Sequence, residues 1–356
     1  MLYRESIFIT GFPGFIAGRL LELLIRPETQ FFLLVQRHLI RRAMEELEAL
    51  AERRGISPER FVIVEGDIAL PNLGISIEDL QTIQYETTEV FHLAAAYDLA
   101  VAKDVAFTIN LEGTKHVNDL VCSIKNLRRY NYISTCYVAG NRTGVILETE
   151  LEHREGFRNF YEETKYLAEI EVEKLKGLLP VTIYRPAVVV GDSRSGETVK
   201  YDGIYYLINY LRKFPSILRL LNIGNPNVRL NLVPVDFVVE SIEALSRDLR
   251  TIGGTYAIAD PAPLTTSEIF DVIAKDLCGR KSEFQLSMRT AEWFLHTGIS
   301  PSVTGLPHHG VPYFFVSQTY DTSLSSEMLK FHHLACPPFP SYVGNLIDFV
   351  EEHPKL

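Results

Sequence analysis

Short apolar runs alternate with amphipathic stretches along the first half of the chain. The apolar runs predict strands at Ser6–Thr10, Phe31–Val35, Phe61–Val64, Glu89–Ala94, Tyr130–Ser134 and Val181–Tyr184. The stretches between them carry apolar residues at helical spacing and predict helices at Phe15–Ile25, His38–Arg54, Val105–Ser123 and Phe160–Leu175. Runs such as FFLLV and FVIV are continuously apolar, which is typical of strands covered on both faces. The pattern therefore predicts an α/β fold built on a doubly wound parallel sheet.

The alternation loosens after about residue 190. A stretch rich in glycine and serine follows, and after it come shorter helical and strand-like segments separated by turns rich in proline. A chain of 356 residues is long enough for about two domains. We expect a nucleotide-binding domain with the catalytic residues at 1–190 and a smaller α+β substrate lobe at 191–356. Some strands and helices of the lobe are expected to be interleaved with the first sheet.

Charge and composition exclude several classes of protein. Hydrophobic residues make up 46% of the chain, which is enough to bury a sizeable core. A net charge of −10 argues against binding to nucleic acid or to an anionic membrane surface. No apolar run is long enough for a transmembrane helix, and the N-terminus does not resemble a signal peptide. We therefore expect a cytoplasmic protein.

The cysteines and histidines give no sign of a metal site. The four cysteines are far apart, which argues against structural zinc and against a disulfide framework. The pairs His308–His309 and His332–His333 lack carboxylates or thiols at matching spacing, so no metal is expected. Cys136 follows a predicted strand, but a small buried side chain is the more ordinary interpretation than a nucleophile.

A glycine-rich turn follows the first predicted strand. In the segment TGFPGFIA, Gly11 permits a tight turn and Gly14 lets backbone N–H groups approach a phosphate at the start of the next helix. The small side chain of Ala17 allows the helix to pack closely on the strand. Because the turn closes the first strand of an alternating chain, it predicts a dinucleotide site in a Rossmann-type domain.

Residues after the second and third strands bear on the choice of cofactor. An NAD site usually has an acidic residue at the end of the second strand, but here the strand ends in Gln36 and Arg37. Arg37, aided by Arg41 or Arg42, could pair with a 2′-phosphate, so NADP(H) is favoured over NAD(H). Asp67 is placed to accept a hydrogen bond from an adenine amino group.

A tyrosine and a lysine are four residues apart on the predicted helix Phe160–Leu175. Tyr161 and Lys165 therefore lie on one face, and a nearby ammonium group lowers the pKa of a phenol. Thr135 ends a buried strand, where its hydroxyl faces the crevice in which α/β sheets bind ligands. Together these three side chains predict proton transfer to or from a substrate oxygen.

The glycine turn, the strand-end hydroxyl and the YxxxK segment, in this order, resemble the extended short-chain dehydrogenase/reductase family. The resemblance implies that Tyr161 is the general acid/base, that Lys165 lowers its pKa and holds the nicotinamide ribose, and that Thr135 binds the substrate oxygen. It also implies that Asn110 supports the active-site water or helix. Taken together, the expected cofactor-binding residues are Gly11, Phe12, Gly14, Phe15, Ile16, Arg37, Asp67, Ile68, Leu93, Ala94, Ala95, Ser134, Tyr161, Lys165, Arg185, Pro186 and Val188.

Longer segments resemble one branch of that family. YISTCYVAG, FYEETKYLAE and TIYRPAVVVGDSRSGET are similar to the thioester-reductase and fatty acyl-CoA reductase branch. The resemblance implies hydride transfer from NADPH to an acyl thioester, on coenzyme A or an acyl-carrier protein, to give an aldehyde or alcohol. The branch typically has arginine at the position of Gln36, whereas here the arginine comes one residue later.

Other assignments remain open at this stage. Tyr97, Tyr137 and Arg194 are candidate substrate-binding residues, and a homodimer is compatible with the family. The alternative function is a sugar-nucleotide epimerase or dehydratase, or a hydroxysteroid or ketone reductase, of the same family. A binding protein without catalytic activity is disfavoured by the intact threonine, tyrosine and lysine.

Overall fold

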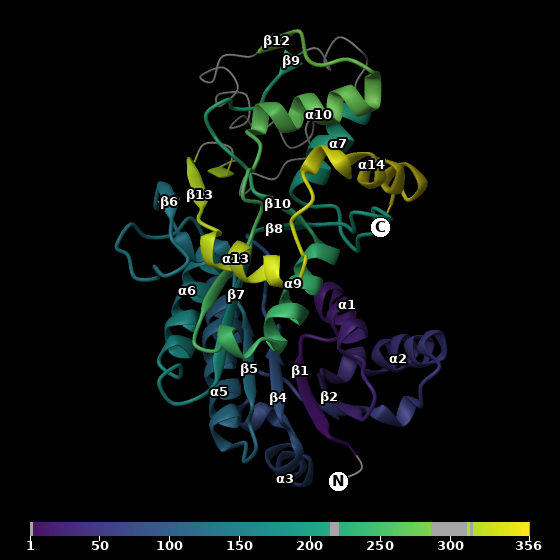
Figure 1. Ribbon diagram of the computed structural model, residues 1–356, viewed down its shortest axis with the longest axis vertical. Helices are drawn as coiled ribbons and strands as arrows, with labels where there is room; N and C mark the ends of the chain where they lie inside the picture. The colour runs from purple at the N-terminus through teal and green to yellow at the C-terminus, as the bar shows by residue number, and fades with distance from the viewer. Residues whose placement is uncertain (1–2, 214–220, 286–311, 314–315, 356) are drawn as a thin grey trace. The chain divides into compact units, whose positions relative to one another are not determined.

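The structure is a computed structural model that describes residues 3–213, 221–285, 312–313 and 316–355 (Figure 1). It divides into two compact units that are interleaved along the chain. The first comprises residues 1–140, 151–185 and 239–256, and the second comprises residues 141–150, 186–238 and 257–356. This division differs from a single boundary after residue 190, because the segment 141–150 joins the second unit and the segment 239–256 returns to the first.

A seven-stranded sheet forms the centre of the first unit, in the order β11-β7-β5-β4-β1-β2-β3. The pairs from β3 to β7 are all parallel. Its strands are β1 (Glu5–Thr10), β2 (Thr29–Val35), β3 (Phe61–Glu65), β4 (Glu89–His92), β5 (Arg129–Ile133), β7 (Val181–Pro186) and β11 (Thr255–Ile258). The chain reverses its winding direction between β1 and β4, so their carboxyl ends border a crevice that can receive a ligand. The predicted α/β fold with a parallel sheet is confirmed.

Helices cover both faces of this sheet. They are α1 (Phe15–Leu24), α2 (Ile40–Arg54), α3 (Ile77–Glu86), α4 (Lys103–Ala106), α5 (Gly113–Ser123), α6 (Phe160–Glu173) and α9 (Val235–Arg247), of which α9 begins in the second unit. One core cluster joins α3, α5 and α6 to strand residues such as Phe8 and Tyr132. Ile7 and Ile9 alternate with Phe8 along β1 and are also fully buried, so the opposite face is covered as well.

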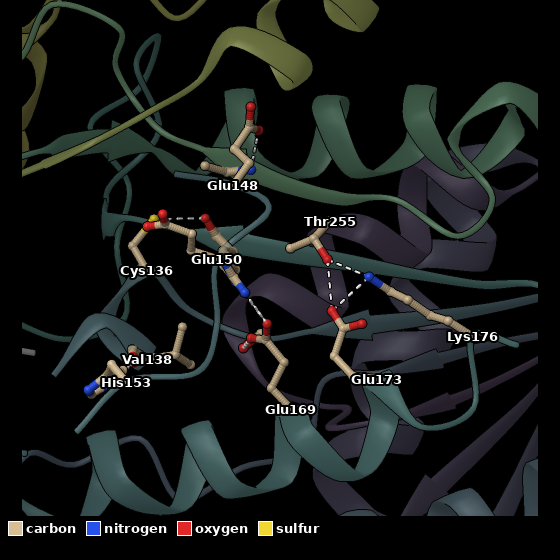
Figure 2. A network of polar contacts seen from close by, with 12 residues as sticks. Cys136, Val138, Glu148, Glu150, His153, Glu169, Glu173, Lys176 and Thr255 are labelled. Carbon is tan, nitrogen blue, oxygen red and sulfur yellow. Dashed lines mark hydrogen bonds and ion pairs between the residues drawn. The ribbon is translucent and has the colours of Figure 1, made fainter. Parts of the chain in front are cut away.

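Polar contacts fix α6 at both of its ends. Asn159 caps the N-terminus, where its side chain accepts a hydrogen bond from the Glu162 N–H at 3.0 Å. Near the C-terminus, the Glu173 carboxylate accepts from Lys176 at 2.7 Å and from the Thr255 hydroxyl of β11 at 3.1 Å, as Figure 2 shows. The helix that carries Tyr161 and Lys165 is therefore held in a fixed position along the sheet.

The second unit has its own core. Helices α7 (Ile204–Lys213), α10 (Thr266–Cys278) and α14 (Val343–Glu352) pack together, and α13 (Ser323–Phe331) follows a short strand. Its strands form three small parallel pairs, β8 (Val188–Val190) with β10 (Leu232–Pro234), β9 (Leu221–Asn222) with β12 (Phe284–Gln285), and β6 (Gly144–Ile146) with β13 (Gln318–Tyr320). Within the described part of the chain, no helix combines the length and apolarity needed to cross a bilayer.

Candidate active site

The turn between β1 and α1 is shaped by two glycines. Gly11 has φ +94°, and a Cβ there would lie 2.9 Å from the Ala94 nitrogen, so the turn packs directly against the chain that leaves β4. Gly14 is exposed at the start of α1, where no side chain caps the helix and the first turn has no acidic residue. A Cβ on Gly14 would meet the Gly11 carbonyl oxygen at 2.6 Å. This open helix N-terminus has the form and polarity to receive a pyrophosphate.

The carboxyl ends of β2 and β3 are linked by polar side chains. The Gln36 amide donates to the Asp67 carboxylate at 2.7 Å, and the Ala69 N–H donates to the same carboxylate at 2.9 Å. Arg37 is 88% exposed, and its Nε lies 3.9 Å from Glu65. Asp67 is thus fixed by its neighbours, and its predicted contact with adenine stays a prediction.

A second arginine reaches the glycine turn from α2. The Arg42 guanidinium donates to the Pro13 carbonyl at 3.2 Å and to the Glu46 carboxylate at 2.7 Å. Arg42 therefore lies beside the open start of α1, where a bound anion would be stabilised by its charge. With Gly11, Gly14 and Arg37, it makes the first unit a fitting host for a nicotinamide dinucleotide.

The side chains predicted to be catalytic come from α6 and from the end of β5. The Thr135 side chain lies close enough to Tyr161 to lower its pKa, and the Thr135 oxygen accepts from the Tyr137 N–H at 3.2 Å. Burial raises the pKa of Tyr161 to about 12, and the hydrogen bond with Thr135 acts in the opposite direction. The structure thus brings the predicted threonine and tyrosine into direct contact.

Lys165 is almost completely buried beneath the same face of α6, with an exposed fraction of 4%. Its Nζ donates to the Tyr132 hydroxyl at 3.1 Å and to the Ile133 carbonyl at 2.9 Å. Burial lowers the pKa of Lys165 to about 8, while the Glu169 carboxylate raises it. The expected lowering of the Tyr161 pKa by Lys165 stays a prediction.

Asn110 lies in a π-helical turn, Phe107–Glu112, between α4 and α5. Its side chain accepts from the Ala96 N–H at 2.7 Å and donates to the Ala96 carbonyl at 3.1 Å and to the Thr164 hydroxyl at 3.0 Å. Asn110 therefore connects the segment after β4 with α6. Insertions of this kind are frequent at functional sites.

Comparison with known proteins identifies the family. Residues 9–242 match the NAD-binding family described as "Male sterility protein", and the match runs from β1 into α9. The chain belongs to this family. The resemblance to extended short-chain dehydrogenases/reductases is thereby confirmed, and the residues described above lie within the matched part.

Relatives of this male sterility family member include known reductases. The fatty acyl-CoA reductase wat of Drosophila melanogaster is 28% identical over 287 residues, which cover 70% of this chain and 55% of that protein. The non-canonical nonribosomal peptide synthetase FrzA of Cladobotryum sp. is 26% identical over 271 residues, which cover 72% of this chain and 26% of that protein. The chain thus spans about half the length of the fatty acyl-CoA reductases that it matches.

Solved structures share the fold of this family member. The terminal R domain of the myxalamid PKS-NRPS pathway has a TM-score of 0.84 at 24% identity, covering 99% of this chain and 92% of that chain. UDP-glucuronic acid 4-epimerase from Bacillus cereus, solved with NAD, has a TM-score of 0.67 at 18% identity, covering 98% and 96%. At these identities the likeness shows the fold alone.

A buried ion pair lies beneath the catalytic face of this male sterility family member. Arg185 donates from Nε at 2.9 Å to the carboxylate of Glu169, which is labelled in Figure 2, and the Ser134 hydroxyl donates to the same carboxylate. The Cys136 thiol donates to the Arg185 carbonyl at 3.1 Å. The side chains of Ser134 and Arg185, both predicted to bind cofactor, therefore contact Glu169, and Cys136 is a small buried side chain.

The remaining predicted residues are more scattered. Tyr97 is 63% exposed and Tyr137 is half-buried, both in the first unit. Pro186, Val188 and Arg194 belong to the second unit, where Arg194 lies 3.9 Å from Asp236. Among the described residues, no group of three His, Cys, Asp or Glu side chains is arranged to hold a metal ion. His308 and His309 lie outside the described residues.

Sequence reasoning missed three residues of the site, namely Gln36 as the partner of Asp67, Tyr132 beneath Lys165, and His92. His92 is fully buried between two threonine hydroxyls, with Nδ1 at 2.7 Å from Thr10 and Nε2 at 3.1 Å from Thr114. The available signal was weak, because His92 ends a strand that also contains Glu89, and Tyr132 lies in a strand that also contains Arg129 and Asn131. Their contacts depend on the strand order, which the sequence pattern leaves open.

Proposed function

We propose that this chain is an NADPH-dependent reductase of acyl thioesters, carried on coenzyme A or on an acyl-carrier protein. The observation that carries the proposal is the pairing of Thr135 with Tyr161, with Lys165 buried beside it on α6. The same unit contains the open glycine turn at Gly11 and Gly14. Relatives that are named fatty acyl-CoA reductases support a thioester as the substrate.

The residues of the site suit reduction of a carbonyl group. The reduced nicotinamide, when bound, supplies a hydride. The carbonyl carbon of the thioester accepts that hydride, the carbon–sulfur bond breaks, and a proton completes the products, which are an aldehyde and a free thiol. A second reduction of the aldehyde, with another hydride and another proton, gives the alcohol.

Thr135 and Tyr161 act on the oxygen of that carbonyl. Negative charge develops on the oxygen as the hydride arrives, and hydroxyl donors fixed in advance stabilise this charge. Because burial raises the pKa of Tyr161 to about 12, the phenol keeps its proton at neutral pH and remains a donor. Lys165 carries a positive charge below a pKa of about 8 and favours the same developing charge.

The choice of NADPH rests on the basic side chains after β2. The strand ends without an acidic residue, and Arg37 and Arg42 stand on either side of the segment leading into α2. The guanidinium of an arginine pairs well with a phosphate group, whereas the ribose 2′-hydroxyl of NADH gives it no anion to bind. Arg37 and Arg42 are therefore the residues that we assign to the 2′-phosphate.

A reductase assay with a matched variant tests the proposal. The full chain is incubated with NADPH and acyl-CoAs of differing length, or acyl-carrier proteins, and consumption of NADPH is followed together with trapped aldehyde. We expect turnover, and a loss of about 100-fold or more in Tyr161→Phe, which removes only the phenolic hydroxyl. Tyr166→Phe removes a hydroxyl from the next turn of α6 and should retain activity.

Two results would overturn the proposal. One is no turnover with any acyl thioester together with turnover of a sugar nucleotide or a steroid ketone. The other is tightly bound NAD(H) released from the purified protein on denaturation, because an epimerase retains its cofactor through the catalytic cycle. Full activity in Tyr161→Phe would reject the catalytic assignment of that residue.

A further inference from the structure

The ammonium group of Lys165 rests on the side chain of Tyr132. Nζ lies 3.1 Å from the Tyr132 hydroxyl oxygen and 4.6 Å from the centroid of the ring. Tyr132 is fully buried, and the other acceptor at Nζ is the Ile133 carbonyl at 2.9 Å. A buried ammonium group needs acceptors for its protons, since burial without them carries a large energetic cost. Tyr132 supplies one of the two protein acceptors seen here.

The contact continues into a chain of buried polar groups. The side chain of Thr114 lies close enough to the Tyr132 hydroxyl to lower the pKa of Tyr132, and its oxygen lies 3.1 Å from His92 Nε2. His92 Nδ1 lies 2.7 Å from the Thr10 hydroxyl, and that hydroxyl accepts from the Ala94 N–H at 3.1 Å. The chain therefore runs from Lys165 on α6 to the ends of β1 and β4, where the glycine turn begins.

The charge state of His92 sets the direction of the hydrogen bonds. Burial, with the Lys165 charge adding to it, lowers the pKa of His92 to about 3, so the imidazole is neutral and has one donor and one acceptor nitrogen. An ammonium group only donates, so the Tyr132 oxygen accepts from Lys165 and its own proton is donated to Thr114. Thr114 then donates to Nε2, and Nδ1–H donates to Thr10. The opposite direction leaves the Tyr132 proton without an acceptor in this chain.

We propose that Tyr132 is a positioning residue that holds the Lys165 ammonium in place and in its charged form, with Thr114 and His92 orienting the Tyr132 hydroxyl. The importance of Lys165 for catalysis rests on the proposed function. The other ionisable groups facing Lys165 are Tyr161 and Glu169 on α6 and the neutral His92 on β4. The Glu169 carboxylate forms an ion pair with Arg185, so the guanidinium already balances its negative charge.

The pKa of Lys165 is the quantity that separates a positioning role from a structural one. Tyr132→Phe removes the acceptor oxygen and keeps the ring under the ammonium group. Loss of an acceptor to a charged donor destabilises the charged form, so the pKa of Lys165 should fall by about one unit, a tenfold change in its protonation equilibrium. It is measured by NMR on the full chain labelled at lysine Cε, with the signal assigned by its absence in Lys165→Met.

Two sets of controls sharpen the test. Tyr130→Phe removes an equally buried hydroxyl from the same strand, one that donates to Asn118 at 2.9 Å, and should leave the pKa of Lys165 unchanged. Thr114→Val removes the acceptor of the Tyr132 proton and should lower the pKa in the same direction. Thr114→Ser keeps a hydroxyl and should restore it. If Tyr132→Phe does not fold, the pKa of Lys165 in the two Thr114 variants still tests the proposal.

The outcomes distinguish this proposal from the proposed function. An unchanged pKa in both Tyr132→Phe and Thr114→Val, or an equal shift in Tyr130→Phe, overturns the positioning role. The pKa is read without turnover, so a wild-type protein that reduces no thioester refutes the function while the NMR result still decides the role of Tyr132. In an active protein, the alkaline limb of the kcat/KM profile should move to lower pH in Tyr132→Phe by the same amount.

Discussion

Arg37 and Arg42 present two guanidinium groups beyond the end of β2. Both form ion pairs that water can reach, Arg37 with Glu65 at 3.9 Å and Arg42 with Glu46 at 2.7 Å, and Arg42 also donates to the Pro13 carbonyl at 3.2 Å. Exposed ion pairs contribute about 1 kcal/mol or less, so either arginine can exchange its carboxylate for a phosphate at little cost. A phosphate can carry two negative charges and a carboxylate carries one, so the phosphate is the stronger partner for an arginine.

Single alanine substitutions test this assignment. Arg37→Ala and Arg42→Ala should each lower kcat/KM for NADPH by about tenfold or more and change kcat/KM for NADH little, because only NADPH has the 2′-phosphate. Steady-state kinetics with both cofactors measures the two effects. Arg53→Ala, at the far end of α2 and paired with Glu22, is the matched control. Equal losses with NADPH and NADH would reject the assignment.

Residues with a motif spacing could be predicted, and residues that act through strand neighbours could not. Thr135 and Tyr161 were both predicted to act on the substrate oxygen, and Thr135 lies close enough to Tyr161 to lower its pKa. Asp67 was expected to accept from adenine, yet its carboxylate already accepts from Gln36 across the β2–β3 boundary. A contact of this kind requires knowledge that these two strands are adjacent, and a pattern of apolar runs does not contain it.

The helices and strands show the same limit: their positions could be predicted from the sequence pattern, but features that depend on contacts with other elements could not. Most predicted strands and helices of the first unit agree with the structure within a few residues. The helix predicted as a continuous Val105–Ser123 instead starts at Lys103 and contains a π-helical turn, since Asn110 is bound to Ala96 and Thr164. Helix α3 was missed although Ser76 caps it, with its oxygen accepting from the Asp79 N–H at 3.0 Å. That serine was the available signal.

The end of α9 depends on one buried arginine. Arg129, at the start of β5, donates to the Leu245 carbonyl at 2.8 Å and to the Ser246 carbonyl at 3.0 Å, and it also contacts Asp248 and Thr251. The Leu245 carbonyl also accepts from the Asp248 N–H at 3.2 Å and from the Thr251 hydroxyl at 2.7 Å, and the guanidinium adds a further cap to the end of the helix. Arg129 thereby attaches the last turn of α9 to the central sheet.

Removing this cap should destabilise the first unit. Arg129→Met keeps the length of the side chain and removes the guanidinium donors from the buried carbonyls of Leu245 and Ser246, which we expect to cost about 2 to 4 kcal/mol of unfolding free energy. Urea unfolding followed by circular dichroism measures the loss. The neighbouring Arg128 is exposed, so Arg128→Met is the control and should change stability by about 0.5 kcal/mol or less. Similar stability in the two variants would show that the cap contributes nothing.

The molecule as a whole carries a charge of −10, so its overall field opposes binding of an anionic cofactor or thioester. Affinity must therefore come from local features of the first unit. We propose that the open N-terminus of α1 and the side chains of Arg37, Arg42 and Lys165 supply it. Because these groups are few, neutralising one of them should matter more than a change of charge elsewhere on the surface.

Stability of the whole fold should also depend on one half-buried carboxyl group, that of Glu89. Glu89 lies at the start of β4, and its carboxylate accepts a hydrogen bond from the Asn131 amide at 2.8 Å. The ionised carboxylate has no proton to donate. Burial raises the pKa of Glu89 from 4.5 to about 7, while the hydrogen bond from Asn131 and the charges of Arg26 and Arg129 lower it. The folded state thus binds the proton more tightly than the unfolded state does. The contribution of the Glu89 carboxyl to stability is complete below pH 4.5 and is lost as the pH rises to about 7.

Glu89→Gln should remove this dependence, because glutamine resembles the protonated carboxyl and still accepts from Asn131. Above pH 7 the variant should be more stable than the wild type by about 3 kcal/mol, and the difference should vanish towards pH 4.5. His92, whose lowered pKa removes stability as the pH falls, is present in both proteins and cancels in the difference. Urea unfolding between about pH 4.5 and 8 measures the two curves, with the exposed Glu48→Gln as control. A difference that stays constant with pH would mean that Glu89 has an ordinary pKa in the folded protein.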